Sequence, residues 1–167
     1  MSLLSLVRRL LSAYPHRSSA PGATSARSDL VDQAVEVDPE RVRDLILRYA
    51  PEPDGAPDAG EIVWTWIPYA EHDGRGKDRP VLVIARHDAQ GVYAVKLTSR
   101  SHDGRGEFIS IGTGRWDRQG RESWVDLDRL YLLPEHAVRR EGATLGRKVF
   151  ARVAAELSRR FGWPVAS

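Results

Sequence analysis

The feature that most constrains this chain is a series of short apolar segments, rich in β-branched and aromatic residues, that begins at Gly60. Turns rich in glycine and aspartate separate the segments, a pattern typical of strands. Six strands are predicted on this basis, over residues 61–67, 81–86, 92–98, 107–111, 123–127 and 130–133. So many short strands at such close spacing favour a small β-barrel.

Two helices are predicted to accompany the strands. Over residues 145–161 apolar side chains recur at helical spacing, and Gly162 and Pro164 follow as stop signals. Nearer the start of the chain, Asp38 offers an N-cap and Pro39 a first helical residue. The apolar side chains that follow this cap at helical spacing are Val42, Leu45, Ile46 and Tyr49. The predicted fold class is therefore mostly β with α, a small barrel with a C-terminal helix and an N-terminal helical extension.

The charges divide the 167 residues into three parts. Residues 1–28 contain four arginines and no acid, and they are predicted to be a basic tail and flexible linker. Within them, residues 1–14 could form an amphipathic helix or a frayed tail. Residues 29–57 form an acidic segment that contains the helix capped by Asp38; together with Asp58 this segment carries a charge of −6. Residues 58–167 form the barrel domain, whose mild basic excess is compatible with an anionic partner without requiring one.

The chain contains no cysteine, which excludes disulfides, thiolate zinc sites and thiol nucleophiles. Its chemistry must therefore use oxygen and nitrogen groups, and neither a metal nor a cofactor is predicted. The apolar runs are far shorter than the ~20 residues that a membrane-spanning helix needs. A cytoplasmic protein without a transmembrane segment is the resulting expectation.

The pentapeptide His-Asp-Gly-Arg-Gly occurs twice, at residues 72–76 and 102–106. Asp-Gly favours tight turns, because glycine readily adopts the positive φ that these turns need. The two copies are either unrelated surface turns or two loops at one end of the barrel that present histidine and arginine to a phosphodiester. Because imidazole titrates near neutrality, His72 or His102 could serve as a catalytic base.

Two further polar positions lie on the predicted strands. Arg79 and Pro80 stand at the entry to the most apolar strand, where arginine is a permanently charged donor that can grip a phosphate through two N–H groups. The alternative is that Arg79 is a solvated edge residue. In the next strand alternate residues share a face, so Lys96 and Thr98 are predicted to project away from the face of Leu97.

Four short motifs and the terminal helix follow one another in a fixed order. The motifs are Gly-Glu-Ile-Val-Trp (60–64), Gly-Lys-Asp-Arg-Pro-Val-Leu-Val-Ile (76–84), Val-Lys-Leu-Thr-Ser (95–99) and Ser-Trp-Val-Asp-Leu (123–127), and Gly142 precedes the helix. In order and spacing this series resembles the MazF/PemK family of toxin endoribonucleases. Each motif is weak alone, and residues 1–57 lie outside the resemblance.

The resemblance implies an SH3-like barrel, a homodimer, metal-independent cleavage of single-stranded RNA, and inhibition by a cognate antitoxin. By position, Arg79 matches the family's catalytic arginine and Thr98 its active-site threonine. The polar residues of the loops and strands around them, which would contact the substrate, are His72, Asp73, Arg75, Lys77, Lys96, Ser99, His102 and Arg105. One departure is Asp73, which stands where many family members have the serine of a Gly-Ser-Glu loop.

Two questions stay open at the level of sequence. The chain could instead be a non-catalytic SH3-like barrel that binds RNA, DNA or a protein partner. The acidic segment could either cover the RNA-binding groove as an internal inhibitor or pack on the barrel as a structural element. Cleavage of RNA in the presence of EDTA separates the first pair of alternatives, and the contacts of the acidic segment separate the second.

Overall fold

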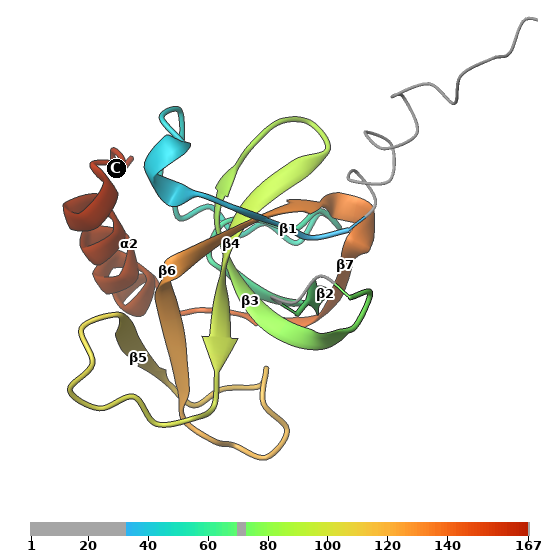
Figure 1. Cartoon of the computed structure of the whole chain (residues 1–167), viewed down its shortest axis with the longest axis vertical. Coiled ribbons are helices and arrows are strands. Elements are labelled where there is room, and N and C mark those ends of the chain that lie inside the picture. The colour runs from blue at the N-terminus through green and yellow to red at the C-terminus, as the bar shows by residue number, and fades with distance from the viewer. Residues whose placement is uncertain (1–32, 70–72, 167) are drawn as a thin grey trace, which may run out of the picture.

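The computed structural model describes residues 33–69 and 73–166. In Figure 1 these residues form a curled antiparallel sheet with one long helix beside it. The helix considered for residues 1–14 and the candidate site residue His72 lie outside the described residues. Among the described residues, no helix is both long enough and apolar enough to cross a membrane.

The sheet has seven strands, and every pairing between them is antiparallel. The strands run in the spatial order β1-β6-β4-β3-β2-β7, and β5 pairs with β6 beside this path. Their bounds are β1 Val35–Val37, β2 Glu61–Pro68, β3 Gly76–Arg86, β4 Gly91–Thr98, β5 Phe108–Gly112, β6 Ser123–Pro134 and β7 Val138–Thr144. The strands predicted over residues 61–67, 81–86, 92–98 and 107–111 are thereby confirmed as β2 to β5.

The sheet curls around its core but does not close into the predicted barrel. Its path ends at β1 and β7, and within the described residues these strands pair only with β6 and β2. Register shifts in the ladders that join β2 to β7, β3 to β4 and β4 to β6 bend the sheet. The mostly β fold with a C-terminal helix is confirmed. The prediction of a closed barrel is wrong, because the edge strand β1 has only three residues and, among the described residues, no ladder joins it to β7.

Strand β6 contains the register shift that shapes the candidate site. Leu97 of β4 lies opposite Val125 of β6, whereas Val95 lies opposite Leu130. Lys96 therefore faces residues 126–129, which bulge away from the ladder. The two strands predicted over residues 123–127 and 130–133 are thus one strand with a bulge between its halves.

The predicted N-terminal helix is wrong. Asp38 does act as a cap, since its Oδ1 accepts a hydrogen bond from the Glu40 N–H at 3.0 Å. The helix that it caps is only the 3-10 turn η1, Pro39–Arg41, after which Val42 is extended, with ψ at 111°. The local sequence signal is sufficient for one turn, and tertiary contacts determine the conformation of the residues that follow.

The residues after η1 run as an extended segment over the core. Leu45 and Leu47 are 1% and 0% exposed, whereas Ile46 is 51% exposed. This alternation has the period of a strand, since a helix would place Leu45 and Ile46 on the same face. The segment is held by the Leu47 N–H, which donates to the Pro164 carbonyl at 2.9 Å, and by the Ala166 N–H, which donates to the Leu47 carbonyl at 2.8 Å.

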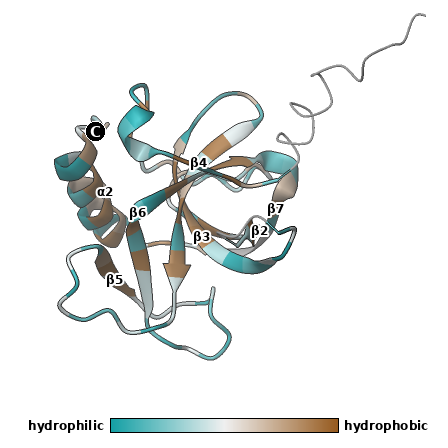
Figure 2. Ribbon diagram, in the orientation of Figure 1, coloured by the Kyte–Doolittle hydropathy of each residue, from teal (hydrophilic) through white to brown (hydrophobic). Residues whose placement is uncertain are grey.

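The C-terminal helix α2, Arg147–Phe161, begins two residues later than predicted and ends as predicted. Gly162 terminates it in the left-handed conformation, with φ at 73°, and its N–H donates to the Ser158 carbonyl at 2.8 Å. The buried face of the helix consists of Phe150, Val153, Ala154 and Leu157. Figure 2 shows the hydrophobic side of α2 turned toward the sheet and the hydrophilic side turned outward. Helix packing thus closes one side of the core.

The extended segment provides a test of this packing. Leu47→Ala should lower the free energy of unfolding by about 2–5 kcal/mol, because a fully buried leucine leaves a cavity when it is truncated. The neighbouring Ile46→Ala is the matched control and should change the free energy of unfolding by only about 0.5 kcal/mol, because Ile46 is exposed. Urea denaturation measures both changes. Equal effects of the two substitutions would contradict the extended packing.

Candidate functional site

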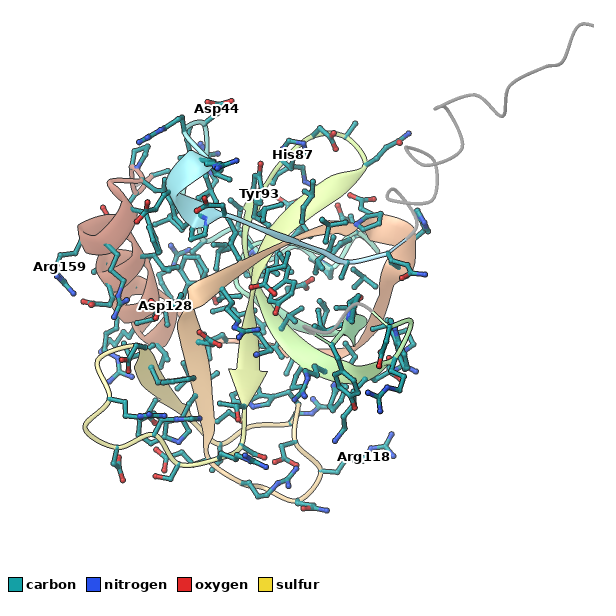
Figure 3. All side chains as sticks on the ribbon, viewed as in Figure 1. Asp44, His87, Tyr93, Arg118, Asp128 and Arg159 are labelled. Atoms are coloured by element: carbon teal, nitrogen blue, oxygen red, sulfur yellow. The ribbon has the colours of Figure 1, made fainter. Side chains whose placement is uncertain are left out.

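A groove of about 550 Å³ lies where β3, β4 and β6 meet the loops on either side of β5. In Figure 1 the arrowhead of β4 points toward these two loops. Figure 3 labels Arg118 on the loop between β5 and β6, at the same end of the molecule. None of the described residues of the acidic segment, 33–57, lines the groove. The part of that segment that the structure describes therefore packs on the core and leaves the groove uncovered.

Basic side chains outnumber acidic ones in the groove. The bases are Lys77, Arg79, Lys96, Arg100 and Arg121, and the acids are Asp78, Asp117 and Asp126. Each acid has a basic partner: the nearest N···O separations are 2.7 Å from Asp78 to Arg139, 2.8 Å from Asp117 to Arg121 and 3.5 Å from Asp126 to Lys96. Within residues 33–69 and 73–166, Lys77, Arg79 and Arg100 form no ion pair. The groove therefore offers these three cations to an anionic ligand.

Arg79 is held on β3 at the point where the strand enters the core. Its backbone lies opposite Thr65 of β2, and Val81, two residues later, is fully buried. Pro80 follows Arg79 and lies opposite Trp64, which also lines the groove. A guanidinium on so rigid a base can present two N–H groups to one phosphate with little loss of conformational freedom.

Lys96 and Thr98 line the groove from the end of β4, while Leu97 between them is buried in the core. The predicted orientation of these three side chains is confirmed. The Thr98 Oγ1 accepts a hydrogen bond from the Arg100 N–H at 3.2 Å. Because this bond uses a lone pair of the oxygen, the hydroxyl hydrogen of Thr98 remains available to donate to a ligand.

Lys96 lies beside a buried carboxylate. Its Nζ is 3.5 Å from the Asp126 Oδ2, and Asp126 is only 7% exposed. Burial lowers the pKa of Lys96 below that of an ordinary lysine. Asp126 opposes this shift, whereas the positive charges of Arg129 and Arg79 add to it.

His102 and Phe108 form an aromatic stack that lines the groove. Their ring centroids are 3.6 Å apart, and the rings are within 6° of parallel. The loop between them is closed by the Arg105 N–H, which donates to the His102 carbonyl, and by the Phe108 N–H, which donates to the Arg105 carbonyl, each at 3.1 Å. Gly104 in this loop has a φ of 74°, which confirms the predicted Asp-Gly turn.

The first copy of the pentapeptide makes a different contribution. Gly74 has a φ of 80°, as the predicted turn requires, but Asp73 is engaged within the turn by Arg75. The Arg75 N–H and Nε–H donate to its two carboxylate oxygens at 3.0 and 2.6 Å. Neither residue lines the groove, whereas Lys77 two residues later does.

The groove thus gathers part of the predicted set of site residues. Those that line it are Lys77, Arg79, Lys96, Thr98, Ser99 and His102. Asp73, Arg75 and Arg105 do not line it, and His72 lies outside the described residues. Within the described part of the chain, no cluster of three or more histidine, aspartate or glutamate side chains could hold a metal ion.

The groove residues that sequence reasoning missed include Arg100, Asp126, Phe108 and Trp116. Trp116 is 6% exposed, and its Nε1–H donates to the Ser123 Oγ at 2.9 Å. Asp126 did carry a signal, because an acid inside the apolar stretch Ser-Trp-Val-Asp-Leu has to be buried with a partner. Phe108 and Trp116 look like ordinary core residues in the sequence and carried no such signal.

Residues 58–161 match the family model described as PemK-like, MazF-like toxin of type II toxin–antitoxin system. Among solved structures, an endoribonuclease in complex with its cognate antitoxin from a mycobacterial species is similar in fold, with 16% identity and a TM-score of 0.51. The match covers 65% of this chain and 98% of that one. No curated protein matches the chain.

Two structures from Deinococcus radiodurans are also similar. MazF has 23% identity and a TM-score of 0.48, over 64% of this chain and 97% of that one. A MazE–MazF complex has 24% identity and a TM-score of 0.47, and the match covers 64% of this chain and 96% of that one.

The three lysines of the chain provide a test of anion binding in the groove. Inorganic phosphate should shift the side-chain NMR signals of Lys77 and Lys96, because both line the groove. Lys148 lies on α2 and serves as the internal control, so its signals should stay in place. Lysine labelled with ¹³C and ¹⁵N makes the three signals resolvable, and Lys→Arg variants assign them. An equal response of all three would contradict a localised anion site.

Proposed function

We propose that this chain, which belongs to the PemK-like, MazF-like toxins of type II toxin–antitoxin systems, cleaves single-stranded RNA in the groove without a metal ion. The observation that carries the proposal is that Arg79, Thr98 and Lys96, from two neighbouring strands, line one groove. Such a groove offers cations for the phosphate and a hydroxyl donor, both of which suit phosphodiester cleavage, and the ring of His102 lines the same groove.

The reaction that suits these groups is attack by a ribose 2′-oxygen on the adjacent phosphorus. The bond from the 2′-oxygen to phosphorus forms, the bond from phosphorus to the 5′-oxygen breaks, and a 2′,3′-cyclic phosphate results. The 2′-hydroxyl gives up its proton to a base, and the leaving 5′-oxygen takes up a proton. Arg79 stabilises the negative charge that develops on the phosphoryl oxygens, and Thr98 donates a hydrogen bond to one of them.

This mechanism selects RNA over DNA, because deoxyribose lacks the attacking hydroxyl. A single strand suits the groove, since the exposed face of the His102–Phe108 stack offers a surface for an unpaired base. The proposed partners are a cognate antitoxin and a second copy of the chain, in the cytoplasm. The antitoxin proposal draws on the similar mycobacterial endoribonuclease, which was solved with its own antitoxin.

Arg79→Ala should reduce cleavage by at least about a hundredfold while leaving the fold intact, because the guanidinium acts on the phosphate and not in the core. The assay uses a labelled single-stranded RNA in EDTA, and circular dichroism checks the fold. The same oligonucleotide with 2′-deoxyribose at every position is the substrate control and should stay intact. Full activity in the Arg79→Ala variant would overturn this assignment. Wild-type protein that binds the RNA without cutting it would favour the non-catalytic alternative.

Two substitutions of Thr98 test whether its hydroxyl is what matters. Thr98→Ser keeps the hydroxyl and should retain cleavage within about threefold, whereas Thr98→Ala should lose about tenfold or more. Steady-state rates on the same RNA measure both. An equal loss in the two variants would mean that the methyl group of Thr98 acts through packing.

Two substitutions of His102 separate stacking from proton transfer. His102→Phe keeps a ring against Phe108 and should preserve RNA affinity and cleavage, whereas His102→Ala should weaken binding modestly, by about threefold to tenfold. Fluorescence anisotropy gives the affinity, and single-turnover rates give the chemistry. If His102→Phe is as inactive as Arg79→Ala, the imidazole is the base and the stacking role is wrong.

A further inference from the structure

We propose that Asp126 is a positioning residue that holds the ammonium group of Lys96 in the groove beside Arg79, so that Lys96 is a second cation on the phosphate. The inference rests on the proposed function, because it assigns a role in phosphate binding within the same groove. It concerns a carboxylate to which the proposed mechanism gives no role.

A buried carboxylate repels an anionic ligand, so its presence in this groove requires a basic partner that compensates its charge. Asp126 is almost fully buried, and an isolated buried charge is strongly disfavoured, so its neighbours have to compensate it. Its Oδ2 lies 3.5 Å from the Lys96 Nζ and 3.9 Å from the Arg129 Nε. Its Oδ1 accepts a hydrogen bond from the Asp128 N–H at 3.2 Å. The backbone and two bases thus fix the carboxylate.

The two bases beside Asp126 are not equivalent. Arg129 is shared with a second acid, because its NH1 lies 3.7 Å from Glu36 Oε2 on β1. Arg129 does not line the groove, whereas Lys96 does. Lys96 is therefore the partner of Asp126 that a ligand can reach. An ammonium has three N–H donors, so Lys96 can remain bonded to Asp126 and still donate to a phosphate oxygen.

The charge of Lys96 depends on Asp126. Burial and the repulsion of Arg129 and Arg79 lower the pKa of Lys96, and Asp126 is the group that raises it. Removing the carboxylate charge therefore lowers the pKa of Lys96 further, and the ammonium loses its proton at a lower pH. As the pH rises, the groove therefore loses the positive charge of Lys96, and it loses this charge at a lower pH when Asp126 is replaced by a neutral residue.

Several other charged groups lie around Lys96 in the groove. Across the groove lie His102, Asp117 and Arg121, and along β3 lie Lys77, Asp78 and Arg79. Arginine keeps its charge at alkaline pH. On β6, burial raises the pKa of Tyr131 to about 12. Lys77 is the other lysine that lines the groove.

The first experiment is a pH–rate profile of RNA cleavage for four variants. Wild-type protein should lose activity at alkaline pH. In Asp126→Asn this loss should move to lower pH and reach about tenfold at pH 9, with a change of less than about twofold at pH 6. Lys96→Arg should remove the alkaline loss, because arginine does not titrate there, and the double variant Asp126→Asn/Lys96→Arg should regain activity at pH 9. Lys148→Arg should keep the wild-type profile, because Lys148 lies on α2 and does not line the groove.

Asp128→Asn is the matched control for the carboxylate substitution. Asp128 lies two residues from Asp126 on β6, and its Oδ1 pairs with Arg160 of α2 at 2.5 Å. Figure 3 labels Asp128 on the part of β6 beside α2. Its substitution should leave the profile unchanged. A profile of Asp126→Asn that equals the wild-type profile would overturn the proposal. So would a loss at every pH that Lys96→Arg does not repair, because that result would give Asp126 a role of its own in the reaction.

The second experiment does not depend on cleavage. In the ¹³C/¹⁵N-lysine spectrum, the titration midpoint of Lys96 should lie below the ordinary lysine value, and Asp126→Asn should lower this midpoint further while Asp128→Asn does not. A 2′-deoxy oligonucleotide, which cannot be cut, should shift the Lys96 signal in wild-type protein. Failure of the wild-type protein to cut RNA would sink the proposed function, and these titrations would still test the inference. A Lys96 midpoint at the ordinary lysine value, or no response to the oligonucleotide, would overturn the inference even if Asp126→Asn did not fold.

Discussion

The register shift between β4 and β6 is the constraint on which the site depends. With Leu97 opposite Val125 and Val95 opposite Leu130, Lys96 has no single partner in the ladder and faces the bulge formed by residues 126–129. Within the bulge, the Asp126 Oδ2 lies 3.5 Å from the Lys96 Nζ and 3.9 Å from the Arg129 Nε. In a regular ladder Lys96 would lie opposite a single residue, Asp126 in the register of Leu97 or Arg129 in the register of Val95, whereas the bulge leaves both charges close enough to act on it. The same register shift therefore bends the sheet and accommodates the charged side chains of Lys96, Asp126 and Arg129.

The core tolerates this charged site because it is closed on its other sides. Helix α2 packs Phe150, Val153 and Leu157 against it, and the extended segment adds Leu45 and Leu47. The Trp163 Nε1–H donates to the Val42 carbonyl at 2.8 Å, which ties the start of this segment to the end of the chain. Residues before and after the strands thus complete one hydrophobic cluster, while the groove end of the sheet stays polar.

Strand positions were predictable from the sequence wherever alternation was strong, as at Lys96, Leu97 and Thr98, whose faces follow from the period of two. The conformation of residues 42–49 was not, because their spacing fits a helix equally well and the choice depends on the partners that Leu47 finds at Pro164 and Ala166. Arg79 and Thr98 were reached through resemblance to a family, whereas Asp126 required the structure. Its partner Lys96 is 30 residues away, and their contact depends on the pairing of β4 with β6, which the sequence does not specify.

The acidic residues of the groove each pair with a basic residue, and these pairs differ in how deeply they are buried. Three acids each engage a base, and this reduces the repulsion that a cluster of cations would otherwise suffer in the absence of a ligand. The acids differ in depth: Asp78 pairs with Arg139 in an exposed position, whereas Asp126 pairs with Lys96 at the floor. An exposed pair is readily screened and contributes little, but a buried pair fixes its members in place. The buried pair of Asp126 and Lys96 is therefore the most strictly ordered charge in the groove, and it lies at the position proposed for the phosphate.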